Sequence, residues 1–294
     1  MGLRRSNTVW GYRYALSTFD SLIHVNRPKN IKKHFVHQQD FGRIFKRGFD
    51  NYVDRTRKQF DIKETDAECG EALNLGLFLL YHSGNALMSK ENPFTAVFID
   101  REKAEELLKM PIIDAQSAFL TISEDSNKSI FALSLPKDLD TQSLTSIEDA
   151  LHGKFTNLRL AMLSGKGQCS ILSHGYSLLK WLHITKFCSK CGSPAEKNTS
   201  GSRVTCSNEK CGLVFYPPTS PVGIVLVTSL AHSHVLLVRQ PKYPVGMYSC
   251  VAGFVDMGET LYDCVKREVA EEAGIEILPH SISSFKVITG DSIS

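Results

Sequence analysis

Four cysteines constrain the folding of this chain more than any other sequence feature. Of its 8 cysteines, Cys188, Cys191, Cys206 and Cys211 form the pattern C-x2-C, fourteen residues, C-x4-C. Two short cysteine pairs across a Gly- and Ser-rich spacer are typical of structural zinc, whose four thiolates leave no open position for water. Disulfides would be unusual in an intracellular chain of this size, so we predict a zinc ribbon over residues 186–217. Two alternatives remain. The ribbon could bind nucleic acid, or the four cysteines could be free.

Charge is divided unevenly along the chain. The net charge is +3, yet residues 1–60 hold thirteen Lys and Arg against four Asp and Glu. Before the first acidic residue, Asp20, "MGLRRSNTVWGYRYALSTF" mixes arginine, hydroxyl and aromatic residues as a mitochondrial transit peptide does. We therefore predict that residues 1–55 are a transit peptide with a basic linker and that the protein is mitochondrial. A disordered basic tail, or one that contacts nucleic acid, is the alternative.

The remaining composition is that of a folded protein with more than one domain. A chain of 294 residues has room for about two domains. Its hydrophobic fraction of 42% and charged fraction of 22% are ordinary for a globular protein. No apolar run approaches the ~20 residues of a membrane span, so we expect no membrane partner.

Hydrophobic patterns predict an α+β domain over residues 56–185. Apolar residues recur with helical spacing across 64–88, and a strand is predicted at 95–100. "AFLTIS" and "SIFALSL" flank a turn-like segment and predict a β-hairpin. Further helices are predicted at 143–165 and 169–187, and the second leads directly to the cysteines.

A third region, residues 218–294, follows the Pro-rich segment 217–221. "VGIVLVTSL" and "VLLVRQ" predict paired strands around the turn "AHSH", and "YSCVAGFVDMGE" predicts a strand that ends in a glycine-containing loop. Helix signals begin at Thr260 and stop at Gly274. A further strand is expected at 275–279.

Three glutamates lie close together on the predicted helix. Glu268, Glu271 and Glu272 are three and four positions apart and project to about one face, and Arg267 stands four positions before Glu271. Uncompensated carboxylates at this density would repel one another and shift each other's pKa. A hard divalent cation such as Mg²⁺ removes that repulsion, because it takes oxygen ligands and bridges carboxylates to phosphates. A solvated acidic helix face is the alternative.

The full spacing around these glutamates resembles the Nudix box without a departure. It reads Gly, five residues, Glu, seven residues, Arg-Glu, an aliphatic, one residue, Glu-Glu, one residue, Gly, an aliphatic; its fixed polar and glycine positions are Gly253, Glu259, Arg267, Glu268, Glu271, Glu272 and Gly274. The resemblance to Nudix hydrolases implies an α/β/α sandwich and Mg²⁺- or Mn²⁺-dependent cleavage of a nucleoside diphosphate. It implies that Glu268 and Glu272 bind the metal with the Ala252 carbonyl, and that Glu271 supports the site.

The order of the regions resembles one branch of that family. A cysteine ribbon followed by "YPP" and a Nudix domain is similar to the NADH pyrophosphatases, and the N-terminal composition to the animal mitochondrial NAD(P)H pyrophosphatases. The resemblance implies hydrolysis of NADH, NADPH or NAD⁺ to nicotinamide mononucleotide and AMP, with Tyr216 contacting the substrate. Decapping of NAD-capped RNA remains open. Relatives are often dimers, so a homodimer also remains open.

One part of the resemblance is missing. The branch carries a Ser-Gln-Pro-Trp-Pro-Phe-Pro motif after the box, where this chain has "SISSFKVITGDSIS", residues 281–294. We therefore expect an incomplete, C-terminally truncated Nudix sandwich over residues 218–294. A non-catalytic remnant, stabilised by zinc and binding a nucleotide or a partner, is the alternative to an enzyme.

Overall fold

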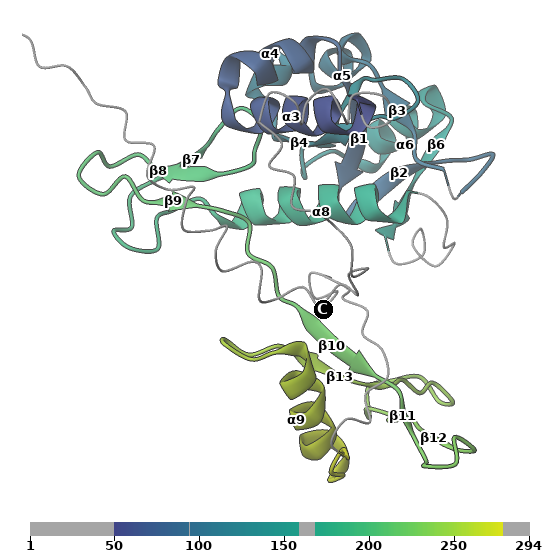
Figure 1. Cartoon of the computed structure of the whole chain (residues 1–294). Helices are drawn as coiled ribbons and strands as arrows, with labels where there is room; N and C mark the ends of the chain where they lie inside the picture. The colour runs from purple at the N-terminus through teal and green to yellow at the C-terminus, as the bar shows by residue number, and fades with distance from the viewer. Residues whose placement is uncertain (1–49, 94, 159–167, 279–294) are drawn as a thin grey trace, which may run out of the picture. The chain divides into compact units, whose positions relative to one another are not determined.

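The computed structural model describes residues 50–93, 95–158 and 168–278 (Figure 1). Most of the predicted transit peptide and all of the segment 281–294 lie outside these residues. The chain divides into two compact units, Met1–Val53 and Asp54–Ser294, and the elements below belong to the second unit apart from the first turn of α3. Helix α3 spans Asp50–Glu64, so the predicted linker boundary at 55 falls within a helix.

A six-stranded sheet organises the N-terminal part of the second unit. Its strand order is β4-β5-β1-β2-β6, and β3 pairs with β1 beside β2. Strands β1 and β5 run parallel, whereas β1–β2, β1–β3, β2–β6 and β4–β5 are antiparallel. The bounds are β1 (Leu77–His82), β2 (Asn85–Ser89), β3 (Phe98–Ile99), β4 (Ser117–Ile122), β5 (Ser129–Ser134) and β6 (Gly153–Asn157). The β4–β5 pair confirms the predicted hairpin.

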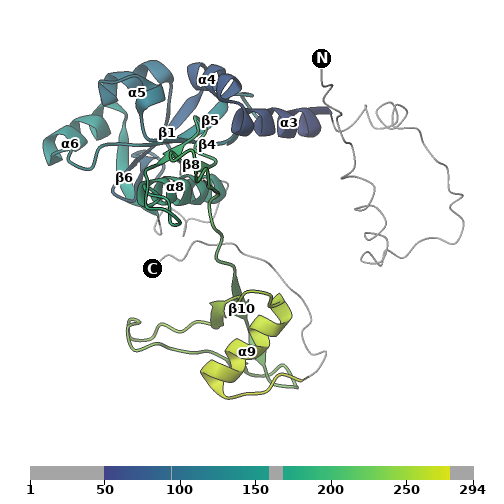
Figure 2. The ribbon, with the colours of Figure 1, turned by 90° about the vertical axis from the view of Figure 1, so that its left-hand side faces the viewer.

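Helices cover both faces of this sheet, as the two views show (Figures 1 and 2). Helix α8 (Cys169–Ile184) packs on one face; the other face carries α3, α4 (Asp66–Asn74), α5 (Arg101–Leu108), η2 (Ile112–Asp114) and α6 (Thr141–Ala150). Alternate residues of β1 belong to the hydrophobic cores on the two faces of the sheet. Leu79 packs toward α8, whereas Phe78 and Leu80 pack toward the helices on the other face. A three-layer α/β/α arrangement results.

Local sequence explains where several helices begin. Asp100, Asp140 and Thr260 each accept a hydrogen bond from the backbone N–H three residues later, which satisfies one of the free donors of the first turn. Helix α9 (Leu261–Ala273) ends at Gly274, whose φ of 66° is left-handed. The predicted limits of this helix are confirmed.

Three predicted elements are wrong in part. The helix predicted over 64–88 ends at Asn74, and the apolar run beyond it forms β1 and β2, because a short run buried on both faces fits a strand as well as a helix. Ser83 and Gly84, with φ of 47° and 84°, turn the chain between these strands. The helix predicted over 143–165 ends at Ala150 and is followed by β6. Residues 275–278 adopt no regular structure, so the predicted strand is absent there.

Three smaller sheets follow. Strands β7 (Ala195–Lys197), β8 (Val204–Cys206) and β9 (Val214–Phe215) form an antiparallel sheet, and Val204 joins the core under α8. Farther along, β10 (Val222–Val225) pairs with β13 (Val251–Phe254), and β11 (Val227–Thr228) pairs with β12 (Val235–Leu236). Helix α9 packs on β10 and β13. The chain is therefore a mixed α and β protein with several sheets.

The helices bear on the question of a membrane span. In the described ranges, none of them combines the length and apolarity that a bilayer crossing demands.

Candidate functional site

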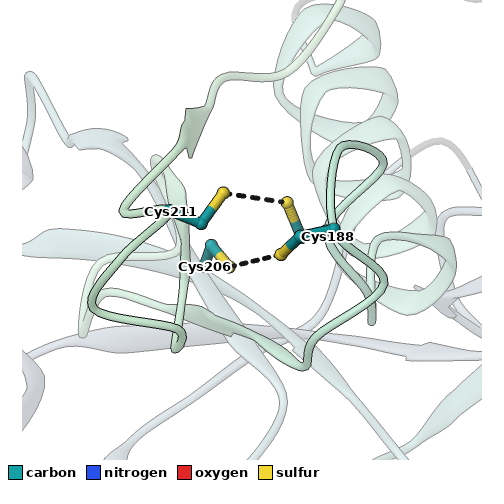
Figure 3. Close-up of side chains that lie close together, drawn as sticks. Cys188, Cys206 and Cys211 are labelled. Atoms are coloured by element: carbon teal, nitrogen blue, oxygen red, sulfur yellow. Dashed lines mark hydrogen bonds between the residues drawn. The ribbon is translucent and has the colours of Figure 1, made fainter.

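The four cysteines of the ribbon meet at one point. Their sulfur atoms all lie within 4.8 Å of one another, although they come from two turns separated in sequence. Cys188 Sγ lies 3.8 Å from Cys211 Sγ, and Cys191 Sγ lies 3.5 Å from Cys206 Sγ (Figure 3). Tetrahedral zinc at about 2.3 Å from each sulfur needs sulfurs about 3.8 Å apart. The donor set therefore fits a tetrahedral metal ion.

The two cysteine pairs are shaped by the same backbone device. A glycine follows the second cysteine of each pair: Gly192 has φ of 74° and Gly212 has φ of 53°. Gly192 N–H donates to Cys188 C=O at 2.8 Å, which closes the first turn, and Gly212 N–H donates to Asn208 C=O at 2.9 Å, which closes the second. A left-handed residue is easiest for glycine, so both turns are encoded locally.

The thiols within the cluster differ in acidity. Hydrogen bonds from Ser193, and then from Cys206, lower the pKa of Cys191 to about 6. Burial raises the pKa of Cys206 to about 12. A metal ion binds thiolates. Because the pKa of Cys191 is about 6, this one cysteine is a thiolate near neutral pH before a metal binds.

The loop between the cysteine pairs is fixed to the N-terminal layer. The Lys63 carbonyl, at the end of α3, accepts hydrogen bonds from Asn198 Nδ2 at 2.9 Å, Ser202 Oγ at 3.0 Å and Ser200 Oγ at 3.1 Å. Phe119 N–H on β4 donates to the Ser200 carbonyl at 2.8 Å. The ribbon thus supplies hydrogen-bond donors to a carbonyl in the last turn of α3, where helical partners are lacking. The cysteine spacing alone does not predict this contact.

Arg267 is the centre of the second candidate site. Its Nε and Nη2 donate to the two carboxylate oxygens of Glu259 at 3.0 and 2.9 Å, and Nη1 donates to Glu268 at 2.8 Å and to Glu271 at 3.2 Å. Nη2 also donates to the Phe254 carbonyl at 2.8 Å. These bonds raise the pKa of Arg267, and those from Arg267 lower the pKa of Glu259. The arginine joins the helix to the loop that precedes it.

Glu268 occupies a place that only glycine leaves open. A Cβ added to Gly253 would lie 1.8 Å from the Glu268 carboxylate, so any side chain there would displace it. The Glu268 side chain is only 12% exposed and lies directly over the backbone of β13. The glycine of the motif is therefore needed for space.

A second glycine, Gly223, also allows close packing under α9. Gly223 on β10 pairs with Gly253 on β13, and a Cβ at Gly223 would lie 2.9 Å from Cys264 Sγ and 3.1 Å from Val265. Cys264 is fully buried, and its thiol lies 3.6 Å from the Phe254 carbonyl. Sequence reasoning missed both residues, although a glycine inside a predicted strand indicates close approach of another element.

The predicted metal carboxylates are not gathered into one group. Among the described residues, the cysteines form a group of three or more ligand side chains within 4.8 Å of one another, and the glutamates of α9 do not. Glu268 and Glu271 are bonded to Arg267, whereas Glu272 is exposed and, among the described residues, accepts no hydrogen bond from Arg267. Their oxygen donors suit a hard cation in chemistry. Ala252 lies on β13, and the Tyr216 side chain is exposed.

Known proteins resemble this chain in sequence. The NUDIX domain family matches residues 217–290. The mitochondrial NAD(P)H pyrophosphatase NUDT13 of Homo sapiens is 35% identical over 236 residues, which cover 77% of this chain and 66% of that protein. The Mus musculus protein of the same name is 34% identical over 253 residues, 83% of this chain and 70% of that protein. The NAD-capped RNA hydrolase ndx-9 of Caenorhabditis elegans is 36% identical over 171 residues, 56% of this chain and 45% of that protein.

The first two relatives are covered to about two thirds of their own length, 66% and 70%. The matched residues of the Nudix domain hold the strand, loop and helix that Arg267 and Glu268 join. The chain belongs to the Nudix hydrolase family and is a relative of the animal mitochondrial NAD(P)H pyrophosphatases.

Proposed function

We propose that this chain is a Nudix pyrophosphohydrolase that hydrolyses NADH, NADPH and NAD⁺ to nicotinamide mononucleotide, reduced or oxidised, and AMP. The printed names of its human and mouse relatives support this reaction. The observation that carries the proposal is the placement of Glu268: Arg267 holds its carboxylate against the bare backbone of Gly253. A buried acidic side chain kept in one position by an arginine is suited to a reaction that needs fixed charges.

Each motif residue has a separate task in this proposal. Arg267 binds Glu259 through two hydrogen bonds and so fixes the loop relative to the helix. Its bond to Glu268 uses Oε1, so Oε2 keeps its lone pairs for another ligand. Glu271 accepts from the same guanidinium and supports it. Glu272 is exposed and available to a ligand that arrives from solvent.

Mg²⁺ or Mn²⁺ is the cofactor that these donors suit. Glu268, Glu272 and the Ala252 carbonyl would hold it, since all three are hard oxygen ligands. When bound, such an ion supplies neutralisation of phosphate charge and activation of water. The Tyr216 side chain, which is 65% exposed, offers an aromatic face to the substrate.

NAD-capped RNA is a second candidate substrate. The Caenorhabditis elegans relative is named an NAD-capped RNA hydrolase, and a capped RNA carries the same pyrophosphate bond as the free dinucleotide. The same motif residues would serve both substrates, because the bond cleaved is the same. The two substrates differ only in the groups attached to that bond.

The proposal includes an organisation for the chain. Residues 56–185 form the N-terminal domain, 186–217 the zinc ribbon and 218–294 the Nudix domain. Zinc in the ribbon is structural, because four thiolates complete its coordination. Residues 1–55 direct the protein to mitochondria, as the names of the human and mouse relatives suggest. Size-exclusion chromatography with light scattering would test whether the chain is a homodimer.

Product analysis tests the reaction. The purified chain is incubated with NADH and Mg²⁺, and the products are identified by mass spectrometry. We expect AMP with reduced nicotinamide mononucleotide. Glu272→Gln should lower the rate by about 100-fold or more, because a metal-binding carboxylate contributes several kcal/mol to the transition state.

A matched control separates this loss from misfolding. Glu276→Gln changes an exposed glutamate beyond the motif and should leave the rate unchanged. Both variants should keep about one zinc per chain, as expected for an intact S₄ site. Absence of turnover by the unmodified chain, with zinc bound and Mg²⁺ present, would contradict the proposal and favour the non-catalytic alternative.

A further inference from the structure

A small cavity lies where the cysteine ribbon meets the N-terminal domain. Its volume is about 220 Å³, and it is lined by the end of α8, the segment before β4, and strands β7 and β8. Leu182 and Val204 give it an apolar wall, while Lys186, Lys197 and Asp114 supply charges. The cavity is separate from both the cysteine cluster and the Nudix motif residues.

Lys197 differs from the paired lysines of the protein. Lys90 and Lys103 hold carboxylates at 2.6 and 2.8 Å, whereas the described part of the chain shows no ion pair or hydrogen bond to the Lys197 ammonium. Lys197 is half-buried at the end of β7, opposite Val204 on β8. Burial without a partner disfavours its charged form.

The charged groups around Lys197 oppose this effect only in part. Burial is the main cause that lowers the pKa of Lys197, and the neighbouring Lys186 lowers it further. Asp66 on α4 opposes the shift, but its carboxylate accepts the Thr199 N–H at 2.9 Å. Cys69 is also close, yet burial raises its own pKa to about 12, so it remains a neutral thiol at physiological pH. Asp114 is exposed at the cavity.

A lysine with a lowered pKa holds more of its free-amine form than an ordinary lysine, and beside a cavity a small electrophile can reach that amine. Desolvation and an adjacent cation are the two ways in which proteins activate lysine for this role. In the reaction with an acyl donor, the amine nitrogen forms a bond to the acyl carbon and the bond from that carbon to its leaving group breaks. The amine proton passes to solvent, and no oxidant or reductant is needed.

We propose that Lys197 is a modification site for small activated acyl groups, which reach it through this cavity. The product is an amide at Lys197, and the leaving group is the thiolate of a thioester or the phosphate of an acyl phosphate. The cavity of about 220 Å³ has room for an acetyl group. This site is independent of the pyrophosphatase proposal.

Competitive acetylation of the full chain tests the proposal. The protein, with zinc bound, is treated with acetyl phosphate in one arm and with a short acetyl thioester in the other. The rate at each lysine is measured by peptide mass spectrometry. Lys58 and Lys128 are exposed and serve as internal references. Near pH 7 Lys197 should react at least about threefold faster than either, since a lower pKa gives more free amine.

A variant tests the part played by the neighbouring charge. Lys186→Met removes one cation from the cavity and should reduce the ratio of Lys197 to Lys58 acetylation, while Lys128→Met should leave the ratio unchanged. Measured zinc content verifies that the ribbon is intact in both variants. Acetylation of Lys197 at a rate equal to or below that of Lys58 in the unmodified chain would overturn the proposal, as would a ratio that Lys186→Met does not change.

Discussion

The cysteine cluster and the Nudix motif are both groups of possible metal ligands, but different neighbours surround them. The four sulfurs converge within 4.8 Å with no cationic side chain bonded to them in the described residues. The motif glutamates are bonded instead to Arg267, which holds Glu259, Glu268 and Glu271. Four thiols gathered this closely depend on a bound metal ion for much of their stability, whereas the glutamates are held together by Arg267. Metal loss should therefore unfold the first and leave the second folded.

The largest effect should come from breaking the cysteine cluster. Cys206→Ser removes a thiolate from the end of β8, and we expect zinc content to fall from about one per chain and the ribbon to lose its fold, because metal binding and folding are one event in such sites. Metal analysis and thermal unfolding measure this. Cys250→Ser, outside the cluster, is the control, and retained zinc in Cys206→Ser would contradict the comparison.

A smaller but specific effect should follow from Gly253→Ala. The new methyl group would collide with the Glu268 carboxylate and push it from its place beside Arg267. We expect loss of NADH hydrolysis by about 100-fold, as for removal of a transition-state contact, with zinc content unchanged. A folded Gly253→Ala protein with normal activity would show that the position of Glu268 does not matter.

The smallest of the three effects should come from Gly223→Ala. Its methyl group would press on Cys264 and Val265, and overpacking of this kind costs about 1–3 kcal/mol. Because the nearest atom is Cys264 Sγ, Cys264→Ala in the same chain should restore much of the loss. Unfolding by urea of the single and double variants measures the coupling. If the losses in unfolding free energy of the two single variants simply add in the double variant, the contact between the new methyl group and Cys264 is not the cause of the loss.

The motifs were more predictable from sequence than the path of the chain between them. The C-x2-C and C-x4-C pairs and the limits of α9 depend on local turns and caps, such as Gly192, Thr260 and Gly274, and local signals survive folding. The helix predicted over residues 75–88 is wrong, because their apolar run fits a buried helix and a buried strand equally well. Only the pairing of β1 with β5 decides in favour of the strand.

Contacts between distant segments could not be predicted at all. The spacing of the glutamates suggested one metal-binding face, yet Arg267 selects Glu259, eight positions away, as its main partner. That choice depends on how the loop 254–259 folds back to the helix. Asn198 and the serines near it likewise gave no signal in sequence for their bonds to Lys63.

The hydrogen bonds to the Lys63 carbonyl link two parts of the protein thermodynamically. Three donors from the loop between the cysteine pairs converge on this single oxygen at the end of α3. If removal of the metal releases that loop, the oxygen loses all three donors together and the last turn of α3 is exposed to fraying. Helix α3 then reports on the occupancy of the cysteines, so amide exchange in its last turn should rise when a chelator strips the ribbon.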